Sequence, residues 1–186
     1  MVRLFIALEL SERQKEEVGV FQEKTKKYLQ NARWVKPGNI HLTLKFLGET
    51  DENRVDLIKG AIDDACYNFS SFSVSYGGGG VFPSERKARV LWIGLTEGAE
   101  SVCSLAENLE EKMVDIGYKK EKRSYHPHLT IGRLRNPPPA SSIKNFLSEG
   151  TGFASSDSTI DRVVLFESSL TRSGAIYRPL YKKELY

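Results

Sequence analysis

The sequence predicts an α+β fold in which antiparallel sheets are backed by helices. Two observations lead to this class. The order strand, helix, strand, helix occurs twice along the 186 residues, and each half contains one strand with a His-x-Thr pattern. There is no obvious linker between the halves. We therefore expect residues 1–186 to form a single domain of two interlocked lobes, a length that suits one shared core.

The first half should begin with a buried strand at residues 2–10, which are rich in β-forming side chains. Ser11 and Gln14 have the spacing of a capping box, which opens a helix that runs to about residue 30. Residues 33–35 form a short extended piece that ends at a Pro-Gly turn. A second amphipathic helix is expected at about residues 51–67.

Between these helices, residues 40–47 alternate between apolar and polar side chains. A strand with this pattern places its aliphatic residues and Phe46 on a core face. His41, Thr43 and Lys45 then lie together on the opposite, exposed face.

The second half should begin with a strand at residues 72–76, which Gly77–Gly80 then interrupt as a flexible turn. No Gly-Lys-Ser/Thr follows these glycines, so a nucleotide-binding P-loop is rejected. The remaining expected elements are a strand at 89–95, a helix at 97–116 ended by Gly117, a strand at 126–132, a short helix at 142–147, and closing strands at 162–167 and 175–181.

Composition indicates an ordinary globular chain, because 40% of the residues are hydrophobic and 27% are charged. The net charge of +3 excludes a strongly basic tail but permits a local basic patch. No apolar run approaches the roughly 20 residues of a membrane span, and the N-terminal apolar run is too short for a signal peptide. We expect a cytoplasmic protein that does not bind membranes. Cys66 and Cys103 fall in helical patterns and should be buried free thiols.

Two tetrapeptides carry the functional prediction: His41-Leu42-Thr43-Leu44 and His128-Leu129-Thr130-Ile131. Residues i and i+2 of a strand share a face, so each motif presents an imidazole beside a hydroxyl, and the aliphatic residues anchor the other face. The chain has only three histidines, and two of them stand in this duplicated pattern. That concurrence favours a functional role over the structural role expected for a single histidine.

The chemistry that suits this pair is acid–base catalysis at phosphorus. A neutral histidine takes a proton from water while a protonated one gives a proton to the leaving alkoxide, and a pKa of about 6.5 serves both tasks. The threonine hydroxyls can bind the phosphate oxygens, and a nearby cation can stabilise the developing charge. Arg133 follows the second motif closely, and Lys45 is expected on the exposed face of the first.

An alternative is a zinc site with His41, His126 and His128 as ligands. No cysteine pair or His-Glu pattern supports it, and the threonines would have no role, so we predict no metal. His126 then supports His128 or lines the site.

Other residues carry weaker signals. Arg33 and Trp34 could pair and stack with a nucleotide, although Trp34 fits a core position equally well. The basic run Lys119–Arg123 could guide an RNA backbone, and Ser173 and Tyr177 could lie at the edge of the site.

With these residues in view, the chain resembles the 2H phosphoesterase superfamily, and most of all its RNA 2′,3′-cyclic phosphodiesterase branch, also called 2′-5′ RNA ligase. The likeness extends over nearly the whole chain. Its segments, in the order of that branch, are Arg33-Trp34-Val35, residues 41–48, residues 80–83, residues 89–92 and residues 127–133.

The resemblance implies a bilobal fold with two antiparallel sheets, outer helices and a pseudo-twofold axis through a central cleft, with one motif on each side. It makes His41 the proton donor and His128 the proton acceptor. It also makes Thr43, Thr130 and Arg133 the phosphate-binding residues, while spacing alone does not decide which histidine is the acid.

The activity implied is hydrolysis of RNA 2′,3′-cyclic phosphate ends to 2′-phosphomonoesters, with 2′-5′ ligation in the opposite direction. Neither direction requires ATP, a metal or another cofactor, and we expect a monomer. The candidate substrate contacts are Arg33, Lys45, His126 and Tyr177. A non-catalytic RNA- or nucleotide-binding module that uses the same site is the alternative from a different class.

Overall fold

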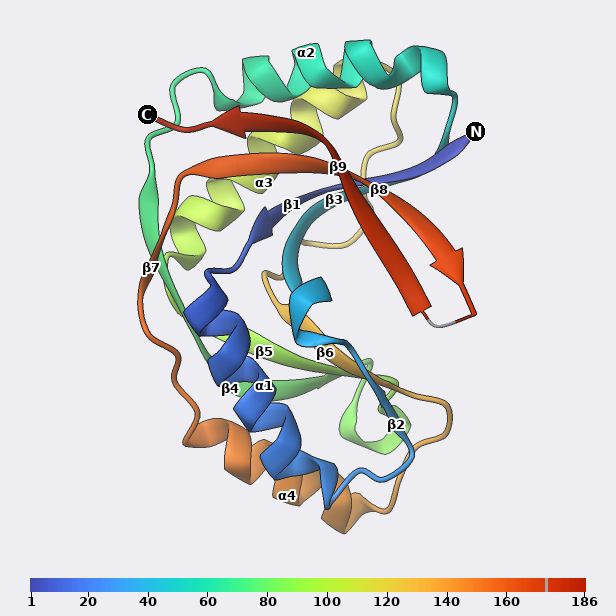
Figure 1. Cartoon of the computed structure of the whole chain (residues 1–186), viewed down its shortest axis with the longest axis vertical. Coiled ribbons are helices and arrows are strands. Elements are labelled where there is room, and N and C mark those ends of the chain that lie inside the picture. The colour runs from blue at the N-terminus through green and yellow to red at the C-terminus, as the bar shows by residue number, and fades with distance from the viewer. Residues whose placement is uncertain (173) are drawn as a thin grey trace.

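The computed structural model describes residues 1–172 and 174–186, and Figure 1 shows its elements. The α+β class is confirmed, since nine strands and four α-helices form within these residues. The strands are β1 Val2–Glu9, β2 Ala32–Trp34, β3 His41–Thr50, β4 Phe72–Phe82, β5 Val90–Glu97, β6 Leu129–Leu134, β7 Ser158–Ile160, β8 Arg162–Thr171 and β9 Gly174–Glu184. The helices are α1 Glu12–Lys26, α2 Val55–Cys66, α3 Ala99–Asp115 and α4 Ala140–Thr151.

The strands pair antiparallel in the order β7-β4-β5-β6-β3-β1-β8-β9, with β2 added to β6. This order has an internal symmetry. The motif strands β3 and β6 lie in the middle, and each is followed outward by three strands of its own half-sheet. The two half-sheets meet through one residue pair, Leu42 with Leu129.

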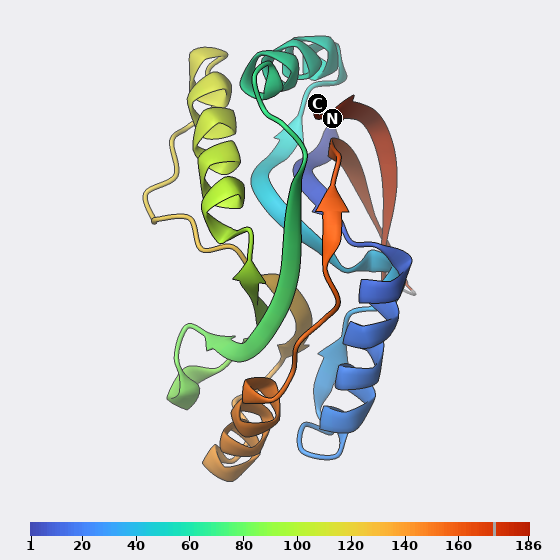
Figure 2. The ribbon, with the colours of Figure 1, turned by 90° about the vertical axis from the view of Figure 1, so that its left-hand side faces the viewer.

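Two helices cross from one half-sheet to the other. Helix α1 follows β1, yet its Gln14 donates a hydrogen bond to the carbonyl of Val74 on β4, at 3.2 Å. Helix α3 follows β5, yet it packs against α2 and β3. Figures 1 and 2 show the result: α2 and α3 lie at one end of the molecule, and α1 and α4 lie at the other. Helices α1 and α3 therefore each connect the two half-sheets.

Burial differs between the two faces of the sheet. The main core takes in Leu42 and Leu129, both fully buried, together with the apolar faces of the helices. A second, smaller cluster lies apart from that core and consists of Phe5, Ala7, Val164 and Phe166. Burying an aliphatic or aromatic side chain stabilises a fold by about 1.5–3 kcal/mol. This second cluster therefore stabilises the half-sheet that consists of β3, β1, β8 and β9.

The expected break at Gly77–Gly80 is wrong, because these glycines continue β4 and pair with β5. Gly78 has a φ of +69° at a bulge in that pairing. At Gly80, an added Cβ would lie 2.0 Å from the ring of Trp92, and at Gly79 it would lie 3.2 Å from the Cα of Gly150. Glycine is needed at these positions because Trp92 and Gly150 approach the strand backbone closely, which is a common reason for glycine inside a strand.

Most element boundaries fall within a few residues of the expected ones. The capping box is confirmed, since the Gln14 amide donates to the Ser11 hydroxyl and the Gln14 side chain accepts from the Ser11 amide. Helix α1 ends at Lys26, before the expected end, and Leu29, which follows it, is buried in the core. Strand β6 begins at Leu129, so His126 lies just ahead of the strand, and the short strand β7 was missed.

Cys66 and Cys103 are free, as expected, although Cys103 is only half-buried. Throughout residues 1–172 and 174–186, no helix is both long enough and apolar enough to cross a membrane.

Candidate active site

The pair Leu42–Leu129 places the four motif side chains on one face of the sheet. Both leucines point into the core, and strand residues on either side of a buried residue point the opposite way. His41 and Thr43 therefore share a face with Thr130 and, next to the strand, His128. We call this the site face. Continuing the antiparallel register from this pair sets His41 opposite Thr130 and Thr43 opposite His128. The two histidines are then diagonal neighbours, and diagonal neighbours in such a pair lie about 7–8 Å apart.

Each motif ends in a β-bulge at the same position. On β3, Thr43 pairs with Ala7 and Lys45 with Ile6, so Leu44 is the extra residue. On β6, Thr130 pairs with Trp92 and Gly132 with Leu91, so Ile131 is the extra residue. A bulge shifts the inside–outside alternation by one residue.

The bulge corrects two sequence predictions in the first half. Lys45 was expected on the exposed face with His41, but it is 5% exposed and points to the core side. Its ammonium group contacts Glu110 Oε2 at 2.5 Å and the carbonyl of Lys119 at 3.3 Å. Phe46 was expected in the core, but it is 63% exposed and lies beside Phe5, with ring centroids 6.2 Å apart. Lys45 is therefore not placed to contact a substrate.

The corresponding bulge in the second half brings Arg133 onto the site face. Without Ile131 as the extra residue, Arg133 would point away from Thr130. The positive charge of Arg133 lowers the pKa of His128. It also opposes the rise that burial causes in the pKa of Tyr177. Arg33 on β2 is the direct cross-strand neighbour of Arg133. Both arginines are exposed.

A hydrogen bond and two aromatic contacts fix the orientation of the His41 imidazole. Its Nδ1 lies 2.8 Å from the carbonyl oxygen of Asn39, which can only accept, so Nδ1 carries the proton. The imidazole stacks on Phe5 at 4.7 Å and meets Tyr177 edge-on at 5.1 Å. Burial lowers the pKa of His41, and the Asn39 carbonyl partly opposes this. The Asn39 side chain in turn donates to the carbonyl of Ala175 on β9, at 2.8 Å.

His128 is held in the same way. Its Nδ1 donates to the carbonyl oxygen of His126 at 2.6 Å, and its ring contacts Phe82 edge-on at 5.0 Å. The ring of His126 packs edge-on against Trp92 at 5.1 Å. Burial lowers the pKa of His128 most, the hydrogen bond to the His126 carbonyl partly opposes this, and the charges of His126 and Arg133 lower the pKa further.

The two imidazoles are thus matched. Each uses Nδ1 to donate to the carbonyl two residues earlier, which fixes the ring and leaves the lone pair on Nε2. Because both pKa values are lowered, both rings are predominantly neutral near pH 7 in the free protein.

Hydrogen bonds connect the loop that precedes the second motif to β3, the strand of the first motif. Tyr125 donates its hydroxyl proton to the carbonyl of Thr43 at 2.8 Å. Glu110 accepts from the backbone amide of Glu121 through one oxygen while its other oxygen contacts Lys45. The basic run Lys119–Arg123 is exposed on this loop.

The structure therefore brings together most of the residues that the sequence singled out; those on or beside the site face are His41, Thr43, His128, Thr130, Arg133, Arg33, His126 and Tyr177. Ser173 lies outside the described residues. Sequence reasoning missed Asn39, Phe5 and Trp92. Asn39 had a detectable signal, because it precedes His41 by the same two positions by which His126 precedes His128.

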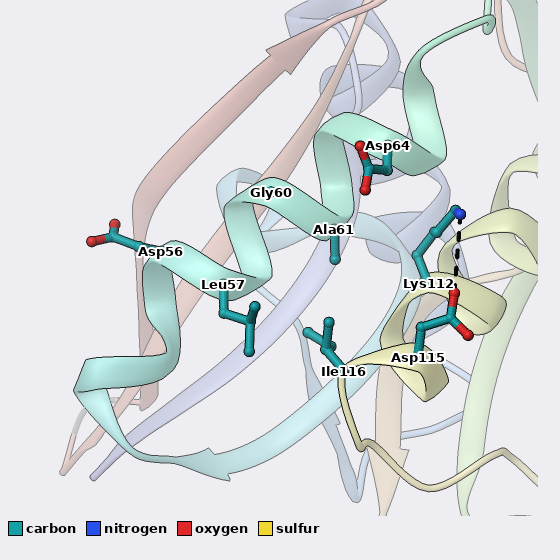
Figure 3. A pocket seen from close by; sticks show the side chains of 8 residues that line it. All are labelled: Asp56, Leu57, Gly60, Ala61, Asp64, Lys112, Asp115 and Ile116. Atoms are coloured by element: carbon teal, nitrogen blue, oxygen red, sulfur yellow. Dashed lines mark ion pairs between the residues drawn. The ribbon is translucent and has the colours of Figure 1, made fainter.

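Figure 3 shows a surface groove between α2 and α3, and no residue of either motif is among those that line it. Its polar lining consists of Asp56, Asp64, Asp115 and Lys112, and the last two lie 4.0 Å apart as an ion pair. Within the described part of the chain, no group of three His, Cys, Asp or Glu side chains is arranged to hold a metal ion.

Comparison with known proteins shows the family of this chain. The family model described as LigT-like phosphoesterase matches the chain twice, over residues 8–92 and 93–177, so each match contains one motif. The fold and the paired motifs thus define a 2H phosphoesterase, and the chain belongs to the LigT-like phosphoesterase family.

Its relatives carry a more specific name. An RNA 2′,3′-cyclic phosphodiesterase of Methanothermobacter thermautotrophicus is 33% identical over 176 residues, which is 95% of each chain. An RNA 2′,3′-cyclic phosphodiesterase of Thermotoga maritima is 34% identical over 181 residues, 97% of this chain and 94% of the relative.

Solved structures show the same fold. The protein TT0787 of Thermus thermophilus superposes with a TM-score of 0.81 and 24% identity, covering 98% of this chain and 97% of the other. Escherichia coli LigT complexed with 3′-AMP gives a TM-score of 0.75 and 24% identity, covering 99% and 98%.

Proposed function

We propose that this protein hydrolyses 2′,3′-cyclic phosphate ends of RNA to 2′-phosphomonoesters. One observation carries the proposal: two histidines flank the Leu42–Leu129 pair, and each has its Nδ1 held by the carbonyl two residues earlier. The names of the relatives, at 33% and 34% identity over nearly the full chain, support the same reaction.

In the proposed reaction, Nε2 of neutral His128 accepts a proton from water as the water oxygen attacks phosphorus. The bond from phosphorus to the 3′-oxygen breaks, and protonated His41 gives the Nε2 proton to that oxygen. A 3′-hydroxyl and a 2′-phosphomonoester result, and the two histidines have exchanged protonation states. The anionic substrate favours the required protonation of one histidine, although burial alone keeps both neutral.

Charge develops on the non-bridging phosphate oxygens during this step. Thr43 and Thr130 stand one strand period from the two histidines, where their hydroxyls can donate to those oxygens. Arg133 supplies the positive charge on the same face. Exposed Phe46 offers a surface on which a base can stack.

The alternative of a non-catalytic binding module is not favoured, because both motifs are intact and the relatives are named as phosphodiesterases. Ligation uses the same residues, with a 5′-hydroxyl in place of water. Which direction dominates depends on the concentration of RNA ends.

The test is incubation in EDTA with a short RNA that ends in a 2′,3′-cyclic phosphate, followed by identification of the product as a 2′- or 3′-monophosphate. His41→Ala and His128→Ala should each lower turnover by about 10²–10⁴-fold. His126→Ala is the matched control, since it keeps the backbone carbonyl that holds His128 and should lose much less. Full activity in either motif variant would exclude the mechanism, and activity lost in EDTA would indicate a metal.

A further inference from the structure

We propose that Arg33 and Arg133 together form a second anion site, which binds the 5′-phosphate of the nucleotide that carries the cyclic phosphate. In an RNA this group is the phosphodiester that joins the last nucleotide to the rest of the strand. The inference deepens the proposed function and rests on it, because it assumes that a cyclic phosphate occupies the space between the histidines.

The two arginines are fixed side by side. Arg33 and Arg133 are directly opposed on β2 and β6, where Cβ atoms lie about 4.5–5.5 Å apart. The neighbouring pairs point to the other face: Trp34 lies against Gly132, where an added Cβ would come within 3.3 Å of the indole ring. Both guanidinium groups therefore project from the site face, and both are exposed.

Their charges are not balanced by the protein. Like charges directly opposed across a strand pair destabilise it. Neither arginine has an ion-pair partner among the described residues, whereas Arg162 is paired with Asp161 at 2.7 Å and Arg178 with Glu167. Two unpaired guanidinium groups side by side are suited to the forked hydrogen bonding that phosphate oxygens accept. An anion at this position would remove the repulsion.

The position is right for a phosphate next to the reacting one. Arg133 stands three residues beyond Thr130, which at about 3.3 Å per residue, with one residue bulged, is about 7–10 Å along the strand. Arg133 also affects the pKa of His128 and of Tyr177, so its charge reaches toward the reacting phosphate. Arg33 is level with Arg133 along β6 and lies on the same edge of β6 as the first motif, because β2 extends the edge that β3 occupies at Leu129. The two guanidinium groups therefore stand together, about one phosphate spacing along the strand from the reacting phosphate.

The other end of the site face is chemically different. The residue that corresponds to Arg133 in the first motif is Phe46, which follows its bulge by the same number of positions. One end of an internally symmetric site thus carries a directly opposed pair of cations, whereas the other carries an exposed aromatic ring and the single cation Arg3 on β1. This asymmetry distinguishes the phosphate side of a nucleotide from its base side.

The experiment compares two small substrates that differ by one group: adenosine 2′,3′-cyclic phosphate with a 5′-hydroxyl and the same compound with a 5′-phosphate. Wild type should show a kcat/KM about ten- to a hundredfold higher for the 5′-phosphorylated compound, the range expected for charge-assisted hydrogen bonds. Arg33→Ala should remove this preference, because it should lose much more kcat/KM on the 5′-phosphorylated compound than on the 5′-hydroxyl compound. Lys144→Ala, an exposed cation on α4, is the control and should keep the preference.

Equal losses on both substrates in Arg33→Ala would overturn the inference and place Arg33 at the reacting phosphate. A wild type that opens both compounds equally would also overturn it, while leaving the proposed function intact. Binding gives a readout that does not need turnover: adenosine 2′,5′-bisphosphate should bind wild type more tightly than adenosine 2′-monophosphate, and Arg33→Ala should remove that difference. If neither cyclic compound is opened, the proposed function fails, and the binding comparison still decides whether the second anion site exists.

Discussion

Leu42 pairs with Leu129, and this is the only residue pair that joins β3 to β6 in the described structure. Each leucine follows the histidine of its motif. One buried contact therefore sets the relative position of both histidines and both threonines, because all four flank it on the opposite face. The internal symmetry of the sheet passes through this contact, and the bulges at Leu44 and Ile131 stand at equal distances from it.

The first prediction concerns pH. Burial lowers the pKa of both His41 and His128 from the ordinary value of about 6.5, and catalysis needs one protonated and one neutral imidazole. A plot of kcat/KM against pH reports the free enzyme, so it should be bell-shaped with its maximum below pH 6.5. The rate should fall as the pH rises from 7 to 8, because less of the pair then holds a proton.

Arg133→Gln provides the internal check on that profile. The positive charge of Arg133 lowers the pKa of His128, so its removal should raise that pKa and move the bell toward higher pH. The variant should also lose rate through weaker phosphate binding, but loss of rate alone would leave the shape unchanged. A maximum above pH 7 in the wild type, or a bell that moves to lower pH in the variant, would contradict this assignment.

The second prediction concerns Phe46. Base stacking on an aromatic side chain is worth about 1–3 kcal/mol by alanine substitution, so Phe46→Ala should raise KM about tenfold with little change in kcat. Phe46→Tyr should retain the wild-type KM. Val20→Ala, which removes an exposed apolar side chain from α1, serves as the control. Steady-state kinetics on a dinucleotide that ends in a cyclic phosphate would measure all three, and a loss confined to kcat would rule out stacking.

The placement of Phe46 also shows what the sequence can predict. Period-two alternation correctly puts His41 and Thr43 on one face, because the strand is regular up to Thr43. It fails at Lys45 and Phe46 because the bulge at Leu44 depends on pairing with β1, and a partner strand is not visible in local alternation. Arg133 was predicted from proximity to the motif, although strict alternation would have turned it away from Thr130.

The same limit explains the other corrections. A run of four glycines predicts a turn by composition, whereas here the glycines make room for Trp92 and Gly150, which lie far along the chain. Asn39 was missed because an asparagine near a turn is ordinary, and its role comes from a carbonyl two residues before His41. The equivalence of Asn39 and His126 becomes visible only when the two motifs are aligned on each other.

The third prediction tests the close approach at Gly80. An added methyl group would lie 2.0 Å from the Trp92 ring, so Gly80→Ala must displace a side chain that packs against His126 and lies 6.3 Å from His128. We expect a loss of about 1–3 kcal/mol in the free energy of unfolding and a more than tenfold loss of kcat/KM. Gly60→Ala in α2 meets no atom within 4 Å and should stabilise the protein by about 0.5–1 kcal/mol with unchanged activity. Thermal denaturation and the cyclic-phosphate assay measure both, and equal behaviour of the two variants would contradict the packing argument.

The last prediction concerns the ion pair between Lys45 and Glu110, whose side chains are 3% and 18% exposed. Removing one member of a buried pair leaves an uncompensated charge, which costs about 3–5 kcal/mol, whereas removing both charges costs far less. Lys45→Met and Glu110→Gln should therefore each lower the free energy of unfolding by about 3 kcal/mol, measured by urea denaturation.

The variant that combines Lys45→Met with Glu110→Gln should be no less stable than either single one. No charge then remains buried, and the amide that replaces the carboxylate still offers an oxygen to the backbone N–H of Glu121. Losses that simply add would show that the two groups act independently. The pair lies on the core side of β3 and is hydrogen-bonded to the loop that leads to His128. Any loss of activity should therefore come from displacement of that loop, and KM should change little.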